Sequence, residues 1–163
     1  MVNKIKLLIL DFIIAGLGSC KKETNVVYEV NESTVNTFGN PKERIKTTVE
    51  FISIAYQDLF GNTISAQKLS SLSVAYTAFG DKKLIEDMII KNFINQPNTT
   101  IPTQAVMMAD KQKFISETFK KIYNRNPGEY ETWFMEKEIT DNASLTPKMI
   151  YYAMMTSDEY RYY

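Results

Sequence analysis

Acidic side chains gather around the single tryptophan of this sequence, and by type they are the residues best suited to catalysis. Glu129, Glu131, Glu136 and Glu138 all lie within five residues of Trp133. A pair of facing carboxylates is the machinery of glycoside hydrolysis. On a helix, however, residues two apart do not share a face, and acids in the first turn favour the helix dipole. We therefore interpret these glutamates as helix caps and solvated surface, and we expect no catalytic residue among them.

The chain contains no histidine and only one cysteine, Cys20. Histidine is the commonest general base near neutral pH and the commonest metal ligand, so Ser-His-Asp and Cys-His catalysis and His-ligated zinc or haem are excluded. A single cysteine cannot form an internal disulfide or a CxxC redox pair. We expect a protein that is not an enzyme and has no cofactor and no metal site.

The sequence before Cys20 has the order of a secretion signal. Two lysines, Lys4 and Lys6, precede an apolar stretch over 7–17 that only Asp11 interrupts. The stretch is shorter than the roughly 20 apolar residues that a membrane-spanning helix needs. Its end, Leu17-Gly18-Ser19-Cys20, resembles the lipobox of bacterial lipoproteins, in which an apolar residue and two small ones precede the acylated cysteine.

This resemblance implies that residues 1–19 are a signal peptide and that a lipid on Cys20 anchors the protein to the membrane. Several acyl chains, palmitate among them, give stable anchoring where one chain would be marginal. Lys21 and Lys22 follow without the aspartate that retains some lipoproteins at the inner membrane, so we expect anchoring at the outer membrane, on its periplasmic face or at the cell surface. An ordinary secreted or signal-anchored protein with an incidental cysteine remains the alternative, because Asp11 is unusual in a leader.

Composition indicates a folded chain with no nucleic-acid partner. Nineteen basic residues balance nineteen acidic ones, and 44% of residues are hydrophobic. A nucleic-acid binder would show an excess of basic charge on one face. Residues 20–40 are mostly polar, which favours a disordered, flexible tether. The remaining residues, 41–163, are long enough to bury a core.

Apolar spacing of three and four, with caps between the runs, predicts an all-α domain over 41–163, built as a small helical bundle. No run alternates with period two, so strands are not expected. The first helix should carry an apolar face of Ile45, Val49, Ile52, Tyr56 and Leu59. In the first half of the domain we expect one helix from near Pro41 to Gly61, a second that is capped by Ser65 and ends at Gly80, and a third that is capped by Asp81. In the second half we expect a helix over 103–123 and a helix that begins at Thr146-Pro147. Between these two, a further helix should have Asn126 as its N-cap, Pro127 as its first residue and Glu129 as its capping-box partner.

Two parts of this domain repeat each other. Phe51-Ile52-Ser53 recurs as Phe114-Ile115-Ser116, and the Leu84-Ile85 pattern recurs at Met149-Ile150 if two residues are inserted. This spacing predicts two degenerate three-helix repeats, over 43–97 and 103–163. Chance similarity between amphipathic helices is the alternative.

The second copy also resembles a known family. Its aromatic helix, its Arg125-Asn126-Pro127 turn, Trp133 and the ending Ser157-Asp158-Glu159-Tyr160 are similar to the phycobilisome-linker-like helical repeat found in bacterial extracellular proteins. That family has no agreed catalytic residues, so the resemblance implies a helical fold rather than an activity.

Aromatic residues near the C-terminus are the candidates for contact with a partner or ligand. We name Trp133, Tyr160, Tyr162 and Tyr163, because amphipathic rings are enriched at interfaces and stack on sugars. The alternative is a tail that packs on its own domain.

Together these features favour a noncatalytic accessory or scaffold module that binds a protein partner in the cell envelope. A ligand- or glycan-binding lipoprotein that uses the aromatic C-terminal segment is the second hypothesis. A histidine-free carboxylate hydrolase is the third.

Overall fold

The computed structural model describes residues 44–162, and in this range the chain is all-α, as predicted. The expected signal peptide, Cys20 and the tether over 20–40 lie outside the described residues, as does Tyr163. The helices are α2 Thr48–Phe60, α3 Ala66–Ala78, α4 Lys82–Ile94, α5 Gln104–Ala109, α6 Lys111–Tyr123, α7 Glu129–Asp141, α8 Pro147–Met155 and α9 Asp158–Arg161.

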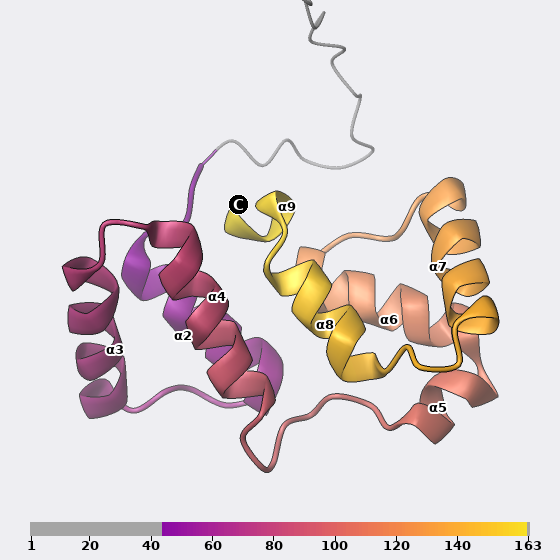
Figure 1. Cartoon of the computed structure of the whole chain (residues 1–163), viewed down its shortest axis with the longest axis horizontal. Coiled ribbons are helices and arrows are strands. Elements are labelled where there is room, and N and C mark those ends of the chain that lie inside the picture. Colours follow the sequence, from indigo (N-terminus) through magenta and orange to yellow (C-terminus); the bar gives the residue numbers. More distant parts are fainter. Residues whose placement is uncertain (1–43, 163) are drawn as a thin grey trace, which may run out of the picture. The chain divides into compact units, whose positions relative to one another are not determined.

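The helices form two groups that share one core (Figure 1). In the first, α2 packs against both α3 and α4; in the second, α6 packs against both α7 and α8. The contact of α4 with α8 joins the groups, and α9 rests on α6 and α8. Large side chains from both groups are fully buried together, including Phe51, Phe93, Ile115 and Tyr151.

The helix bounds agree with the predicted repeat. α6 (111–123) and α7 (129–141) begin and end 63 residues after α2 (48–60) and α3 (66–78). α8 begins at residue 147, which is 65 residues after the start of α4 at residue 82. The two-residue insertion therefore lies in the turn before α8, where the sequence comparison required it.

Equivalent residues of the two copies meet where α4 contacts α8. With the offset of 65, Asp87 and Tyr152 occupy the same position, and the Tyr152 hydroxyl donates to the Asp87 carboxylate. This hydrogen bond therefore joins equivalent positions of the two copies.

Several predicted helix ends are confirmed. Ser65, Asp81 and Thr146 are N-caps whose side chains accept a backbone N–H, and Pro147 is the first residue of its helix. Gly61 ends α2 with φ 70°, in the left-handed region that glycine adopts without a steric cost. Short polar side chains and glycine settle these ends through local hydrogen bonds, so the sequence alone is sufficient to place them.

The prediction for the first helix was wrong at its start and on its face. α2 begins at Thr48, because Thr47 and Glu50 form a capping box, and Ile45 is extended and pairs with Tyr162. Ile45 and Val49 are half exposed. The buried face of α2 consists of Phe51, Ile52, Ala55 and Leu59.

Three other boundaries differ from the prediction. The run over 103–123 is two helices, because Asp110 is extended, with φ −151°, and its carboxylate caps α6. The N-cap of α7 is Gly128 rather than Asn126, and Glu131 rather than Glu129 reaches back to the N-cap backbone. The α3 helix ends at Ala78, and Phe79 is exposed. A short final helix, α9, was not anticipated.

Candidate functional site

Three neighbouring aromatic side chains on α7 are exposed to solvent. Tyr130, Trp133 and Phe134 have exposed fractions of 72%, 57% and 45%. The ring centroids of Tyr130 and Trp133 are 5.7 Å apart, and those of Tyr130 and Phe134 are 6.2 Å apart. We call these three residues the α7 aromatic face. Trp133 was predicted as a contact residue; Tyr130 and Phe134 were not. Trp133 and Phe134 follow Tyr130 by three and four residues, and this helical spacing is the signal that would have found the group.

The orientation of α7 follows from an arginine that holds its first turn. Arg125 Nη1 and Nη2 donate to the Glu131 carboxylate at 2.8 and 2.7 Å, and Arg125 Nε donates to Glu159 at 2.7 Å. The Glu131 carboxylate also accepts from the Gly128 N–H at 2.7 Å. These hydrogen bonds hold the first turn of α7, and Tyr130 and Phe134 line the same hollow as Glu131.

A shallow hollow borders the α7 aromatic face. It has a volume of about 280 Å³ and lies among α6, α7 and α8, with Phe119, Met135 and Met154 among its lining residues. Tyr130 and Phe134 form one of its edges. The face is therefore continuous with an apolar depression into which a partner side chain can be inserted.

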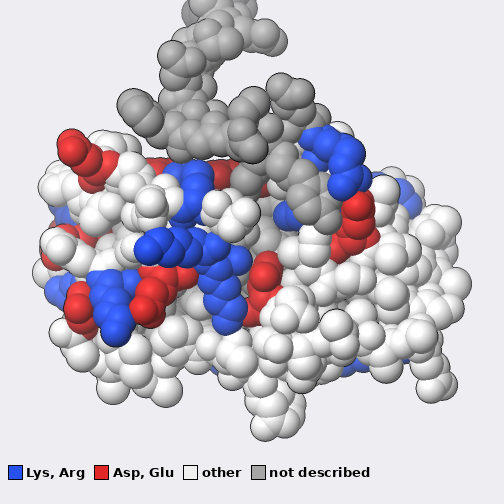
Figure 2. Space-filling view, turned by 180° about the vertical axis from the view of Figure 1, so that it is seen from behind, with Lys and Arg blue, Asp and Glu red and all other residues white. Residues whose placement is uncertain are grey.

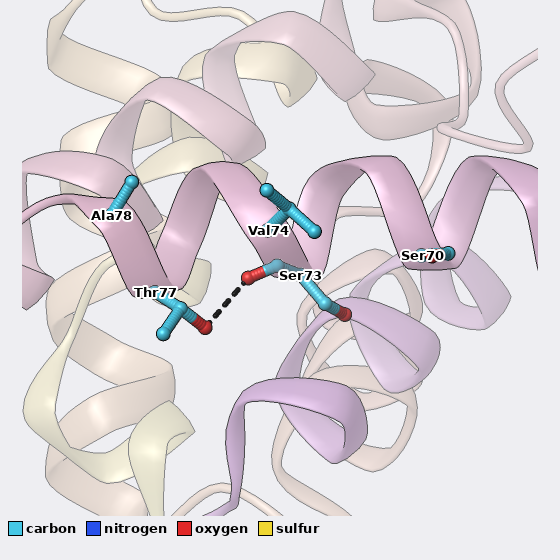
Figure 3. Close-up of a pocket in the computed structure, with 5 residues that line it drawn as sticks. All are labelled: Ser70, Ser73, Val74, Thr77 and Ala78. Atoms are coloured by element: carbon cyan, nitrogen blue, oxygen red, sulfur yellow. Dashed lines mark hydrogen bonds between the residues drawn. The ribbon is translucent and has the colours of Figure 1, made fainter.

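The first copy shows that the fold does not require rings at these positions. With the 63-residue offset, the counterparts of Tyr130, Trp133 and Phe134 on α3 are Gln67, Ser70 and Ser71. The α3 surface instead carries an open hollow lined from one helix only, with Val74 exposed and the Thr77 hydroxyl donating to the Ser73 carbonyl at 2.8 Å (Figure 3). The aromatic residues of α7 therefore do not follow from the needs of the three-helix unit.

Tyr160, predicted as a contact residue, is instead part of the core. Its side chain is fully buried, its ring packs edge-on against Phe51 at 5.9 Å, and its hydroxyl donates to Asp58 at 2.7 Å. The Lys46 ammonium lies 4.1 Å above the ring. The structure thus favours the alternative in which the tail packs on its own domain, because the Asp58 carboxylate supplies the buried partner that a tyrosine hydroxyl needs.

Tyr162 is half buried and has a structural role as well. It pairs with Ile45 in an isolated antiparallel bridge, and the adjacent Lys46 N–H donates to the Arg161 carbonyl at 2.9 Å. Tyr163, the last predicted contact residue, lies outside the described residues. Of the three predicted contact residues within 44–162, only Trp133 is exposed on an open surface.

The C-terminal helix α9 connects elements that are distant in the sequence. Arg161 Nε lies 2.8 Å from the buried Glu86 carboxylate of α4, which also accepts from the Tyr76 hydroxyl of α3 at 2.6 Å. Burial and this hydrogen bond raise the pKa of Tyr76 to about 12. With the contacts described above, α9 is bound to α2 through Asp58, to α4 through Glu86, and to the turn between α6 and α7 through Arg125.

The glutamates around Trp133 are arranged as structural groups. Glu131 is bound to Arg125, and the hydrogen bonds from that guanidinium hold the pKa of Glu131 below its usual range. A carboxyl with a lowered pKa is unsuited to the role of a general acid. Glu136 accepts from Gln112 at 3.2 Å. Within residues 44–162, no group of three or more acidic side chains is arranged to hold a metal ion.

Charges on the visible surface are mixed rather than separated. Figure 2 shows basic side chains beside acidic ones over the same face. Ion pairs among the described residues include Lys91 with Asp87 and Lys83 with Asp158. In the part of the chain that the structure describes, no helix has the length and apolar character needed to cross a bilayer.

Comparisons with family models, with curated proteins and with solved structures found no match for this chain. The similarity of residues 114–160 to the phycobilisome-linker-like repeat therefore stays a prediction, as does the lipobox.

Proposed function

We propose that this chain is a noncatalytic accessory lipoprotein, anchored to the outer membrane through Cys20, whose α7 aromatic face docks a protein partner in the cell envelope. The observation that carries the proposal is the exposure of Tyr130, Trp133 and Phe134 side by side on one ordered helix. The membrane anchor rests on the Leu17-Gly18-Ser19-Cys20 motif of the sequence.

Two physical arguments support a protein partner. Tyrosine and tryptophan dominate binding hot spots, because they bury a large area and lose little conformational entropy. The Arg125–Glu131 hydrogen bonds fix α7 before any partner arrives, so little ordering is left to oppose binding. The polar counterparts Gln67, Ser70 and Ser71 indicate that the rings serve contact rather than folding.

A crosslinking experiment tests the docking surface in the intact lipoprotein. A photoreactive amino acid replaces Lys137, which lies one turn beyond Trp133, or Val74 on α3 as a control site. We expect one discrete crosslinked partner from position 137 in living cells and none from position 74. The proposal is wrong if the two positions crosslink alike.

Substitutions then measure the contribution of the rings. Tyr130→Ala with Trp133→Ala should weaken the crosslink by about thirtyfold or more, since a hot-spot side chain contributes at least about 2 kcal/mol. Val74→Ala with Phe79→Ala removes two similarly exposed apolar side chains from α3 and its C-cap and should leave the crosslink unchanged. Equal effects of the two double variants would exclude the α7 aromatic face as the contact.

Mass spectrometry of the natural product tests the anchor. We expect a chain that begins at residue 20 and carries acyl groups on the Cys20 sulfur and amine. An unmodified thiol, or a retained leader, would remove the membrane anchor from the proposal and leave only the docking surface.

A glycan is the second candidate for the α7 aromatic face, because adjacent exposed rings can stack on the apolar faces of pyranose sugars. The tilt of 36° between the rings of Tyr130 and Trp133 would let each contact a different sugar of one oligosaccharide. Soluble envelope oligosaccharides should then quench Trp133 fluorescence and abolish the crosslink from position 137. An unchanged crosslink in their presence favours the protein partner.

A further inference from the structure

A second concave site lies away from the α7 aromatic face, between α5, α6 and α8. This groove has a volume of about 480 Å³ and is lined by the loop at Thr100 and Pro102, by Val106 and Ala109 of α5, by one side of α6, and by Tyr151 of α8. Its size is in the range of small-molecule sites, which are about 300–1,000 Å³.

The walls of the groove are mostly apolar and differ in accessibility. Phe114 and Tyr151 are buried, with exposed fractions of 3% and 2%, and they form the inner wall. Val106 stands opposite on α5 with 56% of its surface exposed, although it is a large apolar residue. An apolar ligand of a few carbon atoms would cover Val106 and gain the free energy of removing that surface from water.

Most charges along the groove already have a structural role. Asp110 caps α6 by accepting the Lys113 N–H at 2.9 Å, and the Lys113 ammonium lies 3.9 Å from the Glu117 carboxylate one turn on. Asp110 is held at the helix end and Lys113 faces Glu117, so Lys121 is the remaining cation that an anionic ligand would meet in the groove.

Lys121 is held at the groove by a neutral contact. Its ammonium donates to the Thr100 hydroxyl at 2.7 Å and lies 5.8 Å from the Tyr151 ring centroid. Within residues 44–162 the Lys121 ammonium forms no direct ion pair; the Asp58 carboxylate acts on it electrostatically and accepts a hydrogen bond from the Tyr160 hydroxyl. Burial lowers the pKa of Lys121, so the ammonium is partly desolvated. An ammonium has three donors, and an anion that reaches it from the groove would use those that Thr100 leaves free.

We infer that this groove binds a small amphipathic carboxylate, with the carboxylate on the Lys121 ammonium and the apolar part between Val106 and Phe114. An aliphatic acid and the C-terminal residue of a peptide share this chemistry. The charge of Lys121 selects the anion, and the apolar walls select the body of the ligand.

Nuclear magnetic resonance titration of the full isotope-labelled chain tests the inference with two probes, hexanoate and N-acetyl-leucine. At least one should give saturable shifts at Val106 and Ala109 with a dissociation constant below about 10 mM, while the matched amides, hexanamide and N-acetyl-leucinamide, bind at least about tenfold more weakly. Preference for hexanoate assigns the site to free aliphatic acids, and preference for N-acetyl-leucine assigns it to peptide C-termini. Absence of saturable shifts with both acids, or equal binding of acids and amides, overturns the inference.

Matched substitutions locate the site. Lys121→Met and Val106→Trp should each weaken binding by about tenfold or more, the first by removing the charge and the second by filling the groove. Lys113→Met and Val74→Trp are the controls for charge and for bulk, and should leave binding within about twofold. Because Val106 is exposed, Val106→Trp keeps the fold even if Lys121→Met disturbs it. Equal binding by all four variants refutes the placement.

Discussion

Replacing Tyr160 by phenylalanine removes one buried hydrogen bond and keeps the ring. The Tyr160 hydroxyl donates to Asp58 at 2.7 Å, and the side chain is fully buried. Losing a hydrogen bond to a charged acceptor costs about 1.5–3 kcal/mol of unfolding free energy when the acceptor stays buried. For a domain of this size, each kcal/mol corresponds to a fall in Tm of about 3–6 °C, so we expect a decrease of roughly 5–15 °C at pH 7.

The pH dependence gives this prediction a second, independent check. Burial raises the pKa of Asp58, whereas the Tyr160 hydrogen bond lowers it, so the bond stabilises the ionised carboxylate. The loss caused by Tyr160→Phe should therefore shrink as the pH falls from 7 through the raised pKa of Asp58, because the carboxyl becomes protonated there, above the ordinary aspartate pKa. Urea unfolding at a series of pH values measures both the size and the trend.

The control is Tyr130→Phe, because Tyr130 is 72% exposed on α7. Its unfolding free energy should stay within about 0.5 kcal/mol of the parent protein. If Tyr160→Phe behaves like this control, or if its effect grows toward low pH, the assignment of Tyr160 to a buried pair with Asp58 is refuted. Tyr160→Ala, which also removes the ring, should cost about 3–5 kcal/mol.

Three further outcomes are expected. In the parent protein, the Asp58 contribution to the unfolding free energy should fall as the pH rises above about 4, because a carboxyl whose pKa is raised in the folded state favours folding when protonated and loses that contribution as it ionises. Asp58→Asn should flatten this fall, and urea titrations at several pH values check it. Glu131→Gln should lower the unfolding free energy by about 1–2 kcal/mol at pH 7. The loss should be smaller below pH of about 4, because Arg125 lowers the pKa of Glu131 and its stabilisation of the ionised carboxylate disappears when Glu131 is protonated. Thermal unfolding at the two pH values measures the difference. Gly61→Ala should cost about 1 kcal/mol through its φ of +70°, whereas Gly80→Ala, with open space around it, should cost less; a paired denaturant titration compares them.

The position of the C-terminal aromatics also changes how a ligand hypothesis must be tested. If the tail were an open binding surface, deletion of residues 157–163 would abolish binding without unfolding the domain. The structure contradicts this premise, because the segment contributes Tyr160, the Arg161–Glu86 ion pair and the Glu159–Arg125 hydrogen bonds. Point substitutions on α7 and in the Lys121 groove avoid this loss of stability.

Sequence reasoning predicted the helices well where local chemistry decides them. Ser65, Asp81 and Thr146 cap helices because a short polar side chain reaches a free backbone N–H within three residues. It failed at Asp110, where the chain turns between two helices inside one continuous periodic run. The apolar spacing continues across Asp110, but this residue caps α6 by the same local chemistry, and that cap is the signal that could have shown the turn.

The candidate site was predicted in part for a related reason. Trp133 was recognised by its type, but its exposure depends on which face of α7 meets α6, and that packing joins residues of two helices. Tyr160 and Trp133 are both aromatic residues near charged neighbours in the sequence. One is buried and the other is open, because Asp58, over a hundred residues away, accepts the hydroxyl of Tyr160.

The sequence by itself determined the all-α class, the helix ends that carry their own caps, the three-helix periodicity and the chemistry excluded by the absence of histidine. These depend on interactions within a few residues or on composition alone. Only the tertiary structure decided which aromatic residues face solvent, how α9 links the helices, and where Lys121 meets an apolar groove. Each of these depends on contacts between residues far apart in the chain, which local spacing does not encode.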